Sequence, residues 1–265
     1  MDRSAPHPLA VVTGASSGIG LELAKVFAEH GYDLLVTAED PGIAAAADAV
    51  RALGAHVESV QADLATYDGV EQLYARIRAA GRPVEALALN AGVGVGGAFT
   101  GTELRAELNL INLNVVSVVH LAKRIVPDML ARGAGKILFT SSIAAEMPAP
   151  YLSTYAASKA FLFSFAEGLR VELKDAGVTV TALLPGPTDT NFFARADMED
   201  TKIAQMKKDD PREVARDGFK ALMAGKDHIV AGSLKNKAQV AAAQVMADKA
   251  VAAIQGRMTK PGSGG

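Results

Sequence analysis

The chain has 265 residues, of which 49% are hydrophobic, and it carries 27 Lys and Arg against 29 Asp and Glu. It contains no cysteine, which excludes disulfides, thiol catalysis and thiolate metal sites. The balanced charge contains no basic or acidic run, so the sequence predicts neither a nucleic-acid partner nor a membrane partner.

The N-terminal residues, MDRSAPHPLAVV, lack a long apolar signal region, and no run approaches the roughly 20 apolar residues of a membrane span. We therefore expect a cytoplasmic protein. The five histidines form no spaced cluster, so no metal site is predicted.

The first predicted strand, Leu9–Thr13, is a short apolar run typical of a buried parallel strand. It leads through Gly14-Ala-Ser-Ser-Gly18-Ile-Gly20 into a helical pattern over Leu21–His30. A glycine loop between a strand and a helix N-terminus points backbone N–H groups at a phosphate. The spacing differs from the commoner Gly-x-Gly-x-x-Gly, and the alternative is a glycine-rich turn that binds no ligand.

Strands and helices continue to alternate along the chain. Further strands are predicted at Asp33–Thr37, His56–Gln61, Val84–Leu89, Lys136–Thr140, Val178–Leu184 and His228–Val230. Helices are predicted at Ile43–Leu53, Tyr67–Ala80, roughly Leu104–Arg132, Tyr155–Ala176 and Lys235–Gln255. This alternation predicts an α/β fold with a doubly wound parallel sheet of about seven strands, in three layers, α/β/α.

We expect one domain over residues 1–258, since α/β folds of about this length are often single domains. The pattern weakens between residues 187 and 211. Residues 259–265 end in Gly and Ser, and we expect them to form a disordered tail.

One stretch of the sequence carries groups suited to proton transfer. Ser142 follows a predicted strand, and Tyr155 and Lys159 lie four residues apart, on one face of a helix if Tyr155 opens it. A nearby ammonium favours the phenolate and lowers the pKa of a tyrosine. A serine hydroxyl can bond a carbonyl oxygen as it gains negative charge. The alternative is that Tyr155 and Lys159 are merely helix neighbours.

These features gather at one place in the predicted sheet, because ligands bind at the carboxyl ends of parallel strands. The glycine loop follows the first strand, Asn90 the fourth, Ser142 the fifth and Pro185-Gly186 the sixth.

On these residues, the chain resembles the short-chain dehydrogenase/reductase family, with its Rossmann fold, from about Leu9 to Thr190. Thr13–Gly20 resembles the family's cofactor loop, and Asn90-Ala91-Gly92 its fourth-strand motif, although Leu89 stands where the family has a first Asn. Ser142, Tyr155 and Lys159 have the family's catalytic spacing.

The resemblance implies a role for each catalytic position. Tyr155 is the general acid or base, and Lys159 lowers its pKa and binds the nicotinamide ribose. Ser142 holds the substrate oxygen. Asn114, from the run Asn-Val-Val-Ser, supports a water that links Lys159 to solvent.

The resemblance also implies the residues that bind the dinucleotide. Asp63 resembles a position that bonds the adenine amine, although an Asp that caps a turn is an equally good interpretation. The implied set is Gly14, Ser16, Ser17, Gly18, Ile19, Gly20, Glu39, Asp63, Leu64, Asn90, Ala91, Gly92, Tyr155, Lys159, Pro185, Gly186, Thr188 and Thr190.

The choice between NAD and NADP depends on the end of the second strand, Thr37-Ala38-Glu39-Asp40. An acid there binds the ribose hydroxyls and repels a 2′-phosphate. The family's usual Asp position is occupied by Ala38, and Glu39 stands where phosphate-binding members often carry Arg. Two acids without a base favour NAD, although Asp40-Pro41 can also simply begin the next helix.

The resemblance implies a lid at residues 187–211 over an alcohol or carbonyl substrate. Phe192, Phe193, Met147 and Pro148 are candidates for an apolar pocket wall, with ordinary core packing as the alternative. Two long apolar helices, about 104–132 and 155–176, predict a homodimer or homotetramer.

The predicted activity is NAD(P)-dependent interconversion of a secondary alcohol and a ketone. One alternative is a Ser–Tyr lyase related to the dehalogenases, which lack a proper cofactor loop. Another is a non-catalytic dinucleotide sensor.

Overall fold

The computed structural model describes residues 7–264 and contains one seven-stranded sheet in the order β3-β2-β1-β4-β5-β6-β7. All six strand pairs are parallel. The strands are β1 (Leu9–Thr13), β2 (Asp33–Ala38), β3 (Val57–Gln61), β4 (Val84–Leu89), β5 (Gly135–Thr140), β6 (Val178–Pro185) and β7 (His228–Ala231). The predicted doubly wound sheet and all seven strands are confirmed.

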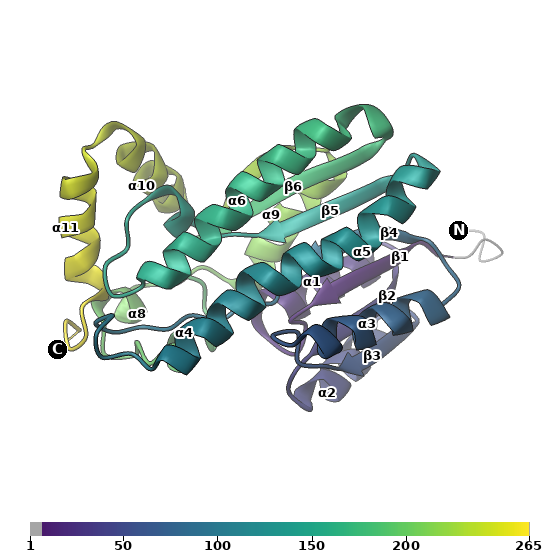
Figure 1. Ribbon diagram of the computed structural model, residues 1–265, viewed down its shortest axis with the longest axis horizontal. Helices are drawn as coiled ribbons and strands as arrows, with labels where there is room; N and C mark the ends of the chain where they lie inside the picture. The colour runs from purple at the N-terminus through teal and green to yellow at the C-terminus, as the bar shows by residue number, and fades with distance from the viewer. Residues whose placement is uncertain (1–6, 265) are drawn as a thin grey trace.

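Helices cover both faces of the sheet and complete the three layers (Figure 1). One face packs against α3 (Tyr67–Ala79), α5 (Ser117–Arg132) and α6 (Ser153–Leu173). The other packs against α1 (Gly18–Glu29), α2 (Gly42–Arg51) and α9 (Pro211–Met223). The central strands β1 and β2 are buried along their whole length, which explains why they read as continuous apolar runs.

The predicted helix over 104–132 is continuous but changes its winding. It comprises α4 (Leu104–Ile111), a π-helical segment, η1 (Asn112–Val116), and α5. By length and composition this 29-residue helix could cross a membrane, with 44% of its most apolar window buried. Its α5 part packs on the sheet, with Val118, Leu121, Ile125 and Met129 in the core.

The predicted lid contains two short helices, α7 (Phe192–Arg195) and α8 (Lys202–Gln205). They pack over the loop that follows β4, where Gly96 N donates to the Ala196 carbonyl at 2.9 Å. A Cβ on Gly94 would lie 2.6 Å from Phe192 Cζ, and one on Gly96 would lie 2.3 Å from Met198 Cγ. The glycines of this loop are therefore needed for the lid to lie close to it.

The prediction of one helix over Lys235–Gln255 is wrong. The chain forms α10 (Leu234–Val245) and α11 (Asp248–Thr259), separated by extended backbone at Met246 and Ala247. The two helices have different partners: α10 contacts the 3-10 helix η2 (Ile143–Glu146), whereas α11 contacts α8. The bend allows both contacts.

The structure also differs from the predicted disorder of residues 259–265, of which Gly265 lies outside the described residues. Thr259 ends α11, and the turns that follow bond the lid. Gly262 N donates to the Asp200 carboxylate at 2.6 Å, and Lys202 N donates to Ser263 Oγ at 3.0 Å. Hydrogen bonds to residues about 60 positions earlier in the sequence therefore order this Gly- and Ser-rich segment.

The long helix α6 ends in a short 3-10 turn. The helix predicted at Tyr155–Ala176 begins two residues earlier, as α6, and ends in the 3-10 turn η3 (Lys174–Ala176). Gly177 follows with φ of +71°, a left-handed conformation that favours glycine at a helix end.

Candidate active site

A single pocket at the carboxyl edge of the sheet brings the predicted residues together. It is lined by the glycine loop after β1, the ends of β2 and β3, the segments after β4, β5 and β6, and the lid. Every residue predicted to bind the cofactor lines it, as do Ser142, Tyr155 and Lys159. Asn114 does not line it.

The glycine loop fits a phosphate group. Ser17 precedes α1 without a side-chain hydrogen bond to the first amides of the helix, so the helix N-terminus borders the pocket without a cap from its own chain. A helix N-terminus attracts anions through its N–H groups and its dipole. The dinucleotide implied by the sequence therefore finds a suitable donor set here.

Close backbone packing joins this loop to the segment after β4. A Cβ on Gly14 would lie 2.8 Å from Ala91 Cα, and one on Gly20 would lie 2.1 Å from the Gly14 carbonyl oxygen. Thr13 Oγ1 accepts hydrogen bonds from the backbone N–H groups of Asn90 and Ala91, each at 3.0 Å. No residue pattern predicted this role for Thr13.

The Asn90 side chain also belongs to this junction. Its Nδ2 donates to the Thr13 carbonyl at 3.1 Å and to the Gly14 carbonyl at 3.4 Å. Asn90 thus holds the glycine loop in place from the neighbouring strand.

Tyr155 and Lys159 lie one turn apart on α6, and Ser142 precedes η2 at the end of β5. Lys159 is buried, and its Nζ donates to the Thr140 carbonyl at 2.9 Å and lies 5.6 Å from the centroid of the Tyr155 ring. Ser142 Oγ accepts a hydrogen bond from Ala144 N at 3.1 Å, donates to the Pro185 carbonyl at 3.5 Å, and lowers the pKa of the Tyr155 hydroxyl. The three side chains predicted from spacing therefore converge.

Burial dominates the ionisation of this pair. It raises the pKa of Tyr155 to about 12, opposed by the hydrogen bond with Ser142. Burial also lowers the pKa of Lys159 to about 8. The net pKa of Tyr155 is therefore raised in this structure, because desolvation of the phenolate dominates. That Lys159 lowers this pKa stays a prediction.

Asn114 lies behind the pocket wall, fully buried in the π-helical segment. Its Oδ1 accepts from Val93 N at 2.9 Å, and its Nδ2 donates to the Val93 carbonyl at 2.9 Å and to Ser158 Oγ at 3.0 Å. A Cβ on Gly92 would lie 3.1 Å from Asn114 Oδ1 and 3.2 Å from Lys159 Nζ. The Asn114 amide and the Lys159 ammonium therefore both lie close to Gly92, and a side chain at this position would crowd both groups.

The end of the pocket at β2 is acidic. Glu39 is exposed there, whereas Asp40 accepts a hydrogen bond from Ser16 Oγ at 2.7 Å. Arg195 of α7 lies 3.8 Å from the Asp40 carboxylate and was not foreseen. Asp40 also accepts from Gly42 N at 3.0 Å, at the start of α2. The N-cap of this helix is Pro41, one residue later than the expected Asp40.

Asp63 lines the pocket at the end of β3 and also serves its own turn. Its carboxylate accepts from Ala65 N at 2.9 Å, an interaction typical of a turn. The two interpretations of this residue are compatible in the structure.

The predicted apolar wall is largely present. Met147, Phe192 and Phe193 line the pocket, and the Phe192 ring centroid lies 5.0 Å from that of Tyr155. Pro148 is exposed and does not line it, because the chain turns outward between its buried neighbours. Three residues of the C-terminal helices, Gln239, Gln255 and Thr259, also line the pocket and were not predicted.

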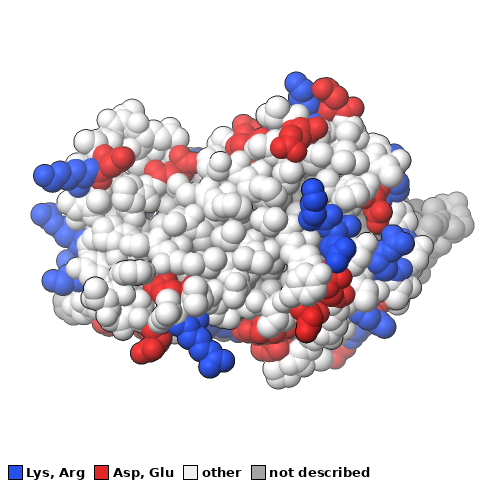
Figure 2. All heavy atoms as spheres, in the orientation of Figure 1, with Lys and Arg blue, Asp and Glu red and all other residues white. Residues whose placement is uncertain are grey.

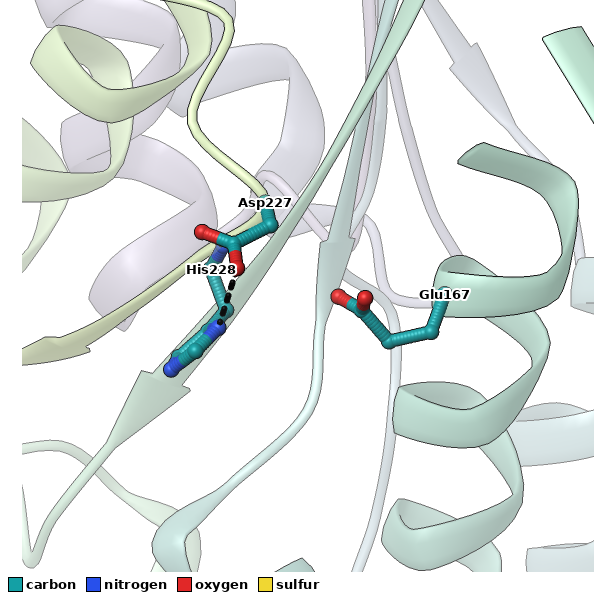
Figure 3. A group of neighbouring side chains, drawn as sticks. All are labelled: Glu167, Asp227 and His228. Carbon is teal, nitrogen blue, oxygen red and sulfur yellow. Dashed lines mark hydrogen bonds and ion pairs between the residues drawn. The ribbon is translucent and has the colours of Figure 1, made fainter. Parts of the chain in front are cut away.

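One group of possible metal ligands occurs among residues 7–264, away from the pocket. Glu167, Asp227 and His228 place one ligand atom each within 4.8 Å of one another (Figure 3). His228 Nδ1 lies 3.3 Å from the Asp227 carboxylate, which also accepts from His228 N at 2.8 Å. These contacts join Asp227 and His228 and leave Glu167 out, and none of the three residues lines the pocket.

The comparisons with known proteins agree with this geometry. A family model described as short chain dehydrogenase matches residues 8–201. The chain is 32% identical over 214 residues to the oxidoreductase UcpA of Salmonella typhimurium, with 80% of this chain and 79% of that protein covered.

Two solved structures show the same fold. A short-chain dehydrogenase from Sphingobium yanoikuyae in complex with NADPH matches with a TM-score of 0.79 at 30% identity, covering 84% of this chain and 87% of that one. A short-chain dehydrogenase/reductase from Burkholderia phymatum in complex with NAD matches with a TM-score of 0.79 at 26% identity, covering 91% and 92%. Proteins similar to this chain therefore bind either dinucleotide.

The lowered pKa of Lys159 predicts a pH-dependent stability. Between pH 8 and 10.5 the folded protein binds fewer protons at Lys159 than the unfolded chain does, so the free energy of unfolding rises with pH. Relative to Lys159→Met, wild type should gain roughly 3 kcal/mol across this window. Urea unfolding of both proteins at intervals from pH 7 to 10.5 measures the difference.

Exposed Lys123 provides the control, since the same substitution there leaves the pocket intact. If the difference between wild type and Lys159→Met stayed constant with pH, burial would not be destabilising the Lys159 ammonium.

Proposed function

Since the chain belongs to the short-chain dehydrogenase/reductase family and is an NAD(P)-dependent oxidoreductase, we propose that it interconverts a secondary alcohol and a ketone, with Tyr155 transferring the proton. The observation that carries this proposal is the convergence of Ser142, Tyr155 and Lys159 in a pocket continuous with the glycine loop. The nicotinamide ring supplies or accepts the hydride when the dinucleotide is bound.

In the reductive direction, Tyr155 donates its hydroxyl proton to the carbonyl oxygen of the substrate. A phenol whose pKa is about 12 is protonated at neutral pH and ready to donate. The Ser142 hydroxyl lines the same pocket and can turn its single proton to the same substrate oxygen. The Lys159 ammonium stabilises the phenolate that remains.

Asn114 acts in this proposal as a positioning residue. Its amide bonds both backbone groups of Val93 and the hydroxyl of Ser158, which in turn donates to the Tyr155 carbonyl at 2.7 Å. It thereby connects the loop after β4 to the turn of α6 that bears the tyrosine. A water linked to Lys159 remains part of the proposal by resemblance to the family.

The two rival functions are less well supported. A Ser–Tyr lyase would not need the glycine loop, whose packing against Ala91 and Asn90 is intact. A non-catalytic sensor would not need Ser142, Tyr155 and Lys159 together in one pocket. Titration with NADH and NADPH followed by a panel of ketones and alcohols distinguishes all three functions.

The proposed cofactor preference is NAD over NADP. Glu39 lines the pocket and is exposed to solvent, so its carboxylate would lie near a 2′-phosphate. Asp40 is paired with Ser16 and Arg195, which reduces its own repulsion of a phosphate. Glu39 is therefore the main determinant in this proposal.

The proposed assembly is a homodimer or a homotetramer formed through the long helices. Apolar side chains are exposed along α4, η1 and α6, among them Leu104, Leu108, Val116 and Phe161. On this face most charged side chains lie toward the edges, and the area over α4 to α6 is largely uncharged (Figure 2). A second copy of the same face would cover it symmetrically.

Replacing Tyr155 by Phe tests the central role. The ring packing remains and only the proton donor is lost, so we expect turnover to fall by about 10²- to 10⁴-fold while dinucleotide affinity stays near wild type. Ketone reduction and fluorescence titration with NADH and NADPH measure the two effects. Tyr67→Phe, at an exposed position outside the pocket, is the control. If the Tyr155→Phe protein kept full activity, Tyr155 would not be the proton donor.

Replacing Glu39 by Arg tests the cofactor preference. Two like charges about 4 Å apart, at an effective dielectric near 20, repel by about 4 kcal/mol. Solvent screening reduces this repulsion to about 1 or 2 kcal/mol, which corresponds to about a tenfold difference in affinity. We expect wild type to bind NADH more tightly than NADPH and Glu39→Arg to reverse the order. Titration of both proteins with both dinucleotides measures this. Tighter NADPH binding by wild type would contradict the preference.

Introducing a charge on the uncharged face tests the assembly. Wild type should be a dimer or a tetramer by light scattering at micromolar concentration, and Leu108→Glu with Val116→Glu should shift it to a smaller species. Leu53→Glu is the control, because it places the same charge beyond the end of α2, which packs on the opposite face of the sheet. This variant should keep the assembly of the wild type. A wild-type monomer would overturn the proposal.

A further inference from the structure

The part of the pocket beyond Tyr155 has apolar walls from two separate segments. Met147, Ala149 and Leu152 come from the segment between β5 and α6, and Phe192, Phe193 and Ile203 come from the lid. Several of these side chains belong to one small apolar cluster that joins the lid to α6. A substrate that occupies this end meets mainly carbon atoms.

The charged residues of the pocket lie elsewhere. Among the described residues, those that line it are Glu39, Asp40, Asp63, Lys159 and Arg195. The three acids follow β2 and β3, Arg195 lies beside Asp40, and Lys159 is held at the Thr140 carbonyl. Among residues 7–264, no charged side chain lines the apolar end, which makes this end unsuited to an anion. Lys208 Nζ lies 5.4 Å from the centroid of the Phe193 ring, but Lys208 does not line the pocket.

The C-terminal helices close the apolar end. They lie beyond the sheet at the left of the molecule, at the opposite side from the N-terminus (Figure 1). Thr259, at the end of α11, donates from Oγ1 to the Pro150 carbonyl at 2.7 Å. This bond ties the end of the chain to the segment that carries Met147 and Leu152.

Two glutamine amides point at one sulfur atom in this wall. Gln255 Nε2 donates to Met147 Sδ at 2.9 Å and Gln239 Nε2 donates to the same atom at 3.6 Å. Gln255 is only 8% exposed, and a buried amide normally finds a strong acceptor. A thioether is a weak acceptor on a flexible side chain. These donors would bond an oxygen better than they bond Met147.

We propose that the site takes an uncharged, largely apolar ketone or alcohol that carries a second oxygen acceptor, which the amides of Gln255 and Gln239 bind at the C-terminal wall. This inference rests on the proposed function and adds the class of substrate. The Met147 thioether fills the acceptor position until the substrate oxygen replaces it. Discrimination by such a pair of donors should reach about tenfold against an analogue that lacks the oxygen.

The test compares aryl methyl ketones of matched size that bear a para-methyl, a para-methoxy or a para-carboxylate group, with the ketone separated from the ring by zero to three methylenes. Wild type should prefer the methoxy compound to its methyl counterpart by about tenfold in kcat/KM at the best chain length, and should disfavour the carboxylate. Gln255→Leu should remove this preference by raising the KM for the methoxy compound alone.

Gln244→Leu is the matched control, because Gln244 lies on the exposed side of α10 and donates to Glu146. Gln239→Leu provides a second variant should Gln255→Leu fail to fold. An equal loss for methoxy and methyl compounds, no methoxy preference at any length, or a preference for the carboxylate would each overturn the inference.

Binding of the same compounds by calorimetry separates this inference from the proposed function. A protein that binds NADH or NADPH and reduces none of the ketones fails as the proposed oxidoreductase of ketones. The methoxy preference in binding, and its loss in Gln255→Leu, would still decide whether the glutamines recognise oxygen.

Discussion

The close approach of two backbone segments, at the ends of the neighbouring strands β1 and β4, is the constraint on which the site depends. Gly14 and Gly20 leave room for it, since a Cβ at either position would overlap Ala91 or the Gly14 carbonyl. Two hydrogen bonds from Asn90 then fix the approach, one from its backbone N–H to Thr13 Oγ1 and one from its side-chain amide to the Thr13 carbonyl. Because the same loop after β4 carries the Asn114 contact and packs under the lid, its position is transmitted to both ends of the pocket.

Desolvation, rather than the attraction between neighbouring charges, sets the resting ionisation of the catalytic pair. Tyr155 and Lys159 are both shifted toward their neutral forms, to pKa values of about 12 and about 8. A site built this way holds its proton on the phenol and supports a phenolate only while a proton is being transferred. The Thr140 carbonyl, which accepts from Lys159 at 2.9 Å, keeps the ammonium close enough to stabilise that charge when it forms.

The sequence was sufficient for the sheet and for most of the pocket, because both depend on local patterns. Apolar β-branched runs mark strands buried on both faces, and the carboxyl ends of parallel strands must meet at one edge. Contacts distant in sequence were not predictable: the bend at Met246, the ordering of Gly262 by Asp200 and the approach of Gln255 to Met147 have no local signature. Ser158 could have been found, since it shares a turn of α6 with Tyr155.

The lid connects the two ends of the pocket through a single four-residue helix, α7. Phe192 at its start packs beside the Tyr155 ring, with the centroids 5.0 Å apart, whereas Arg195 at its end lies 3.8 Å from Asp40. A helix of one turn cannot move one of these residues far without moving the other. An exposed ion pair such as Arg195–Asp40 contributes little stability by itself, so its effect is chiefly on position. One turn of helix therefore places both the side chain that covers Tyr155 and the cation beside Asp40.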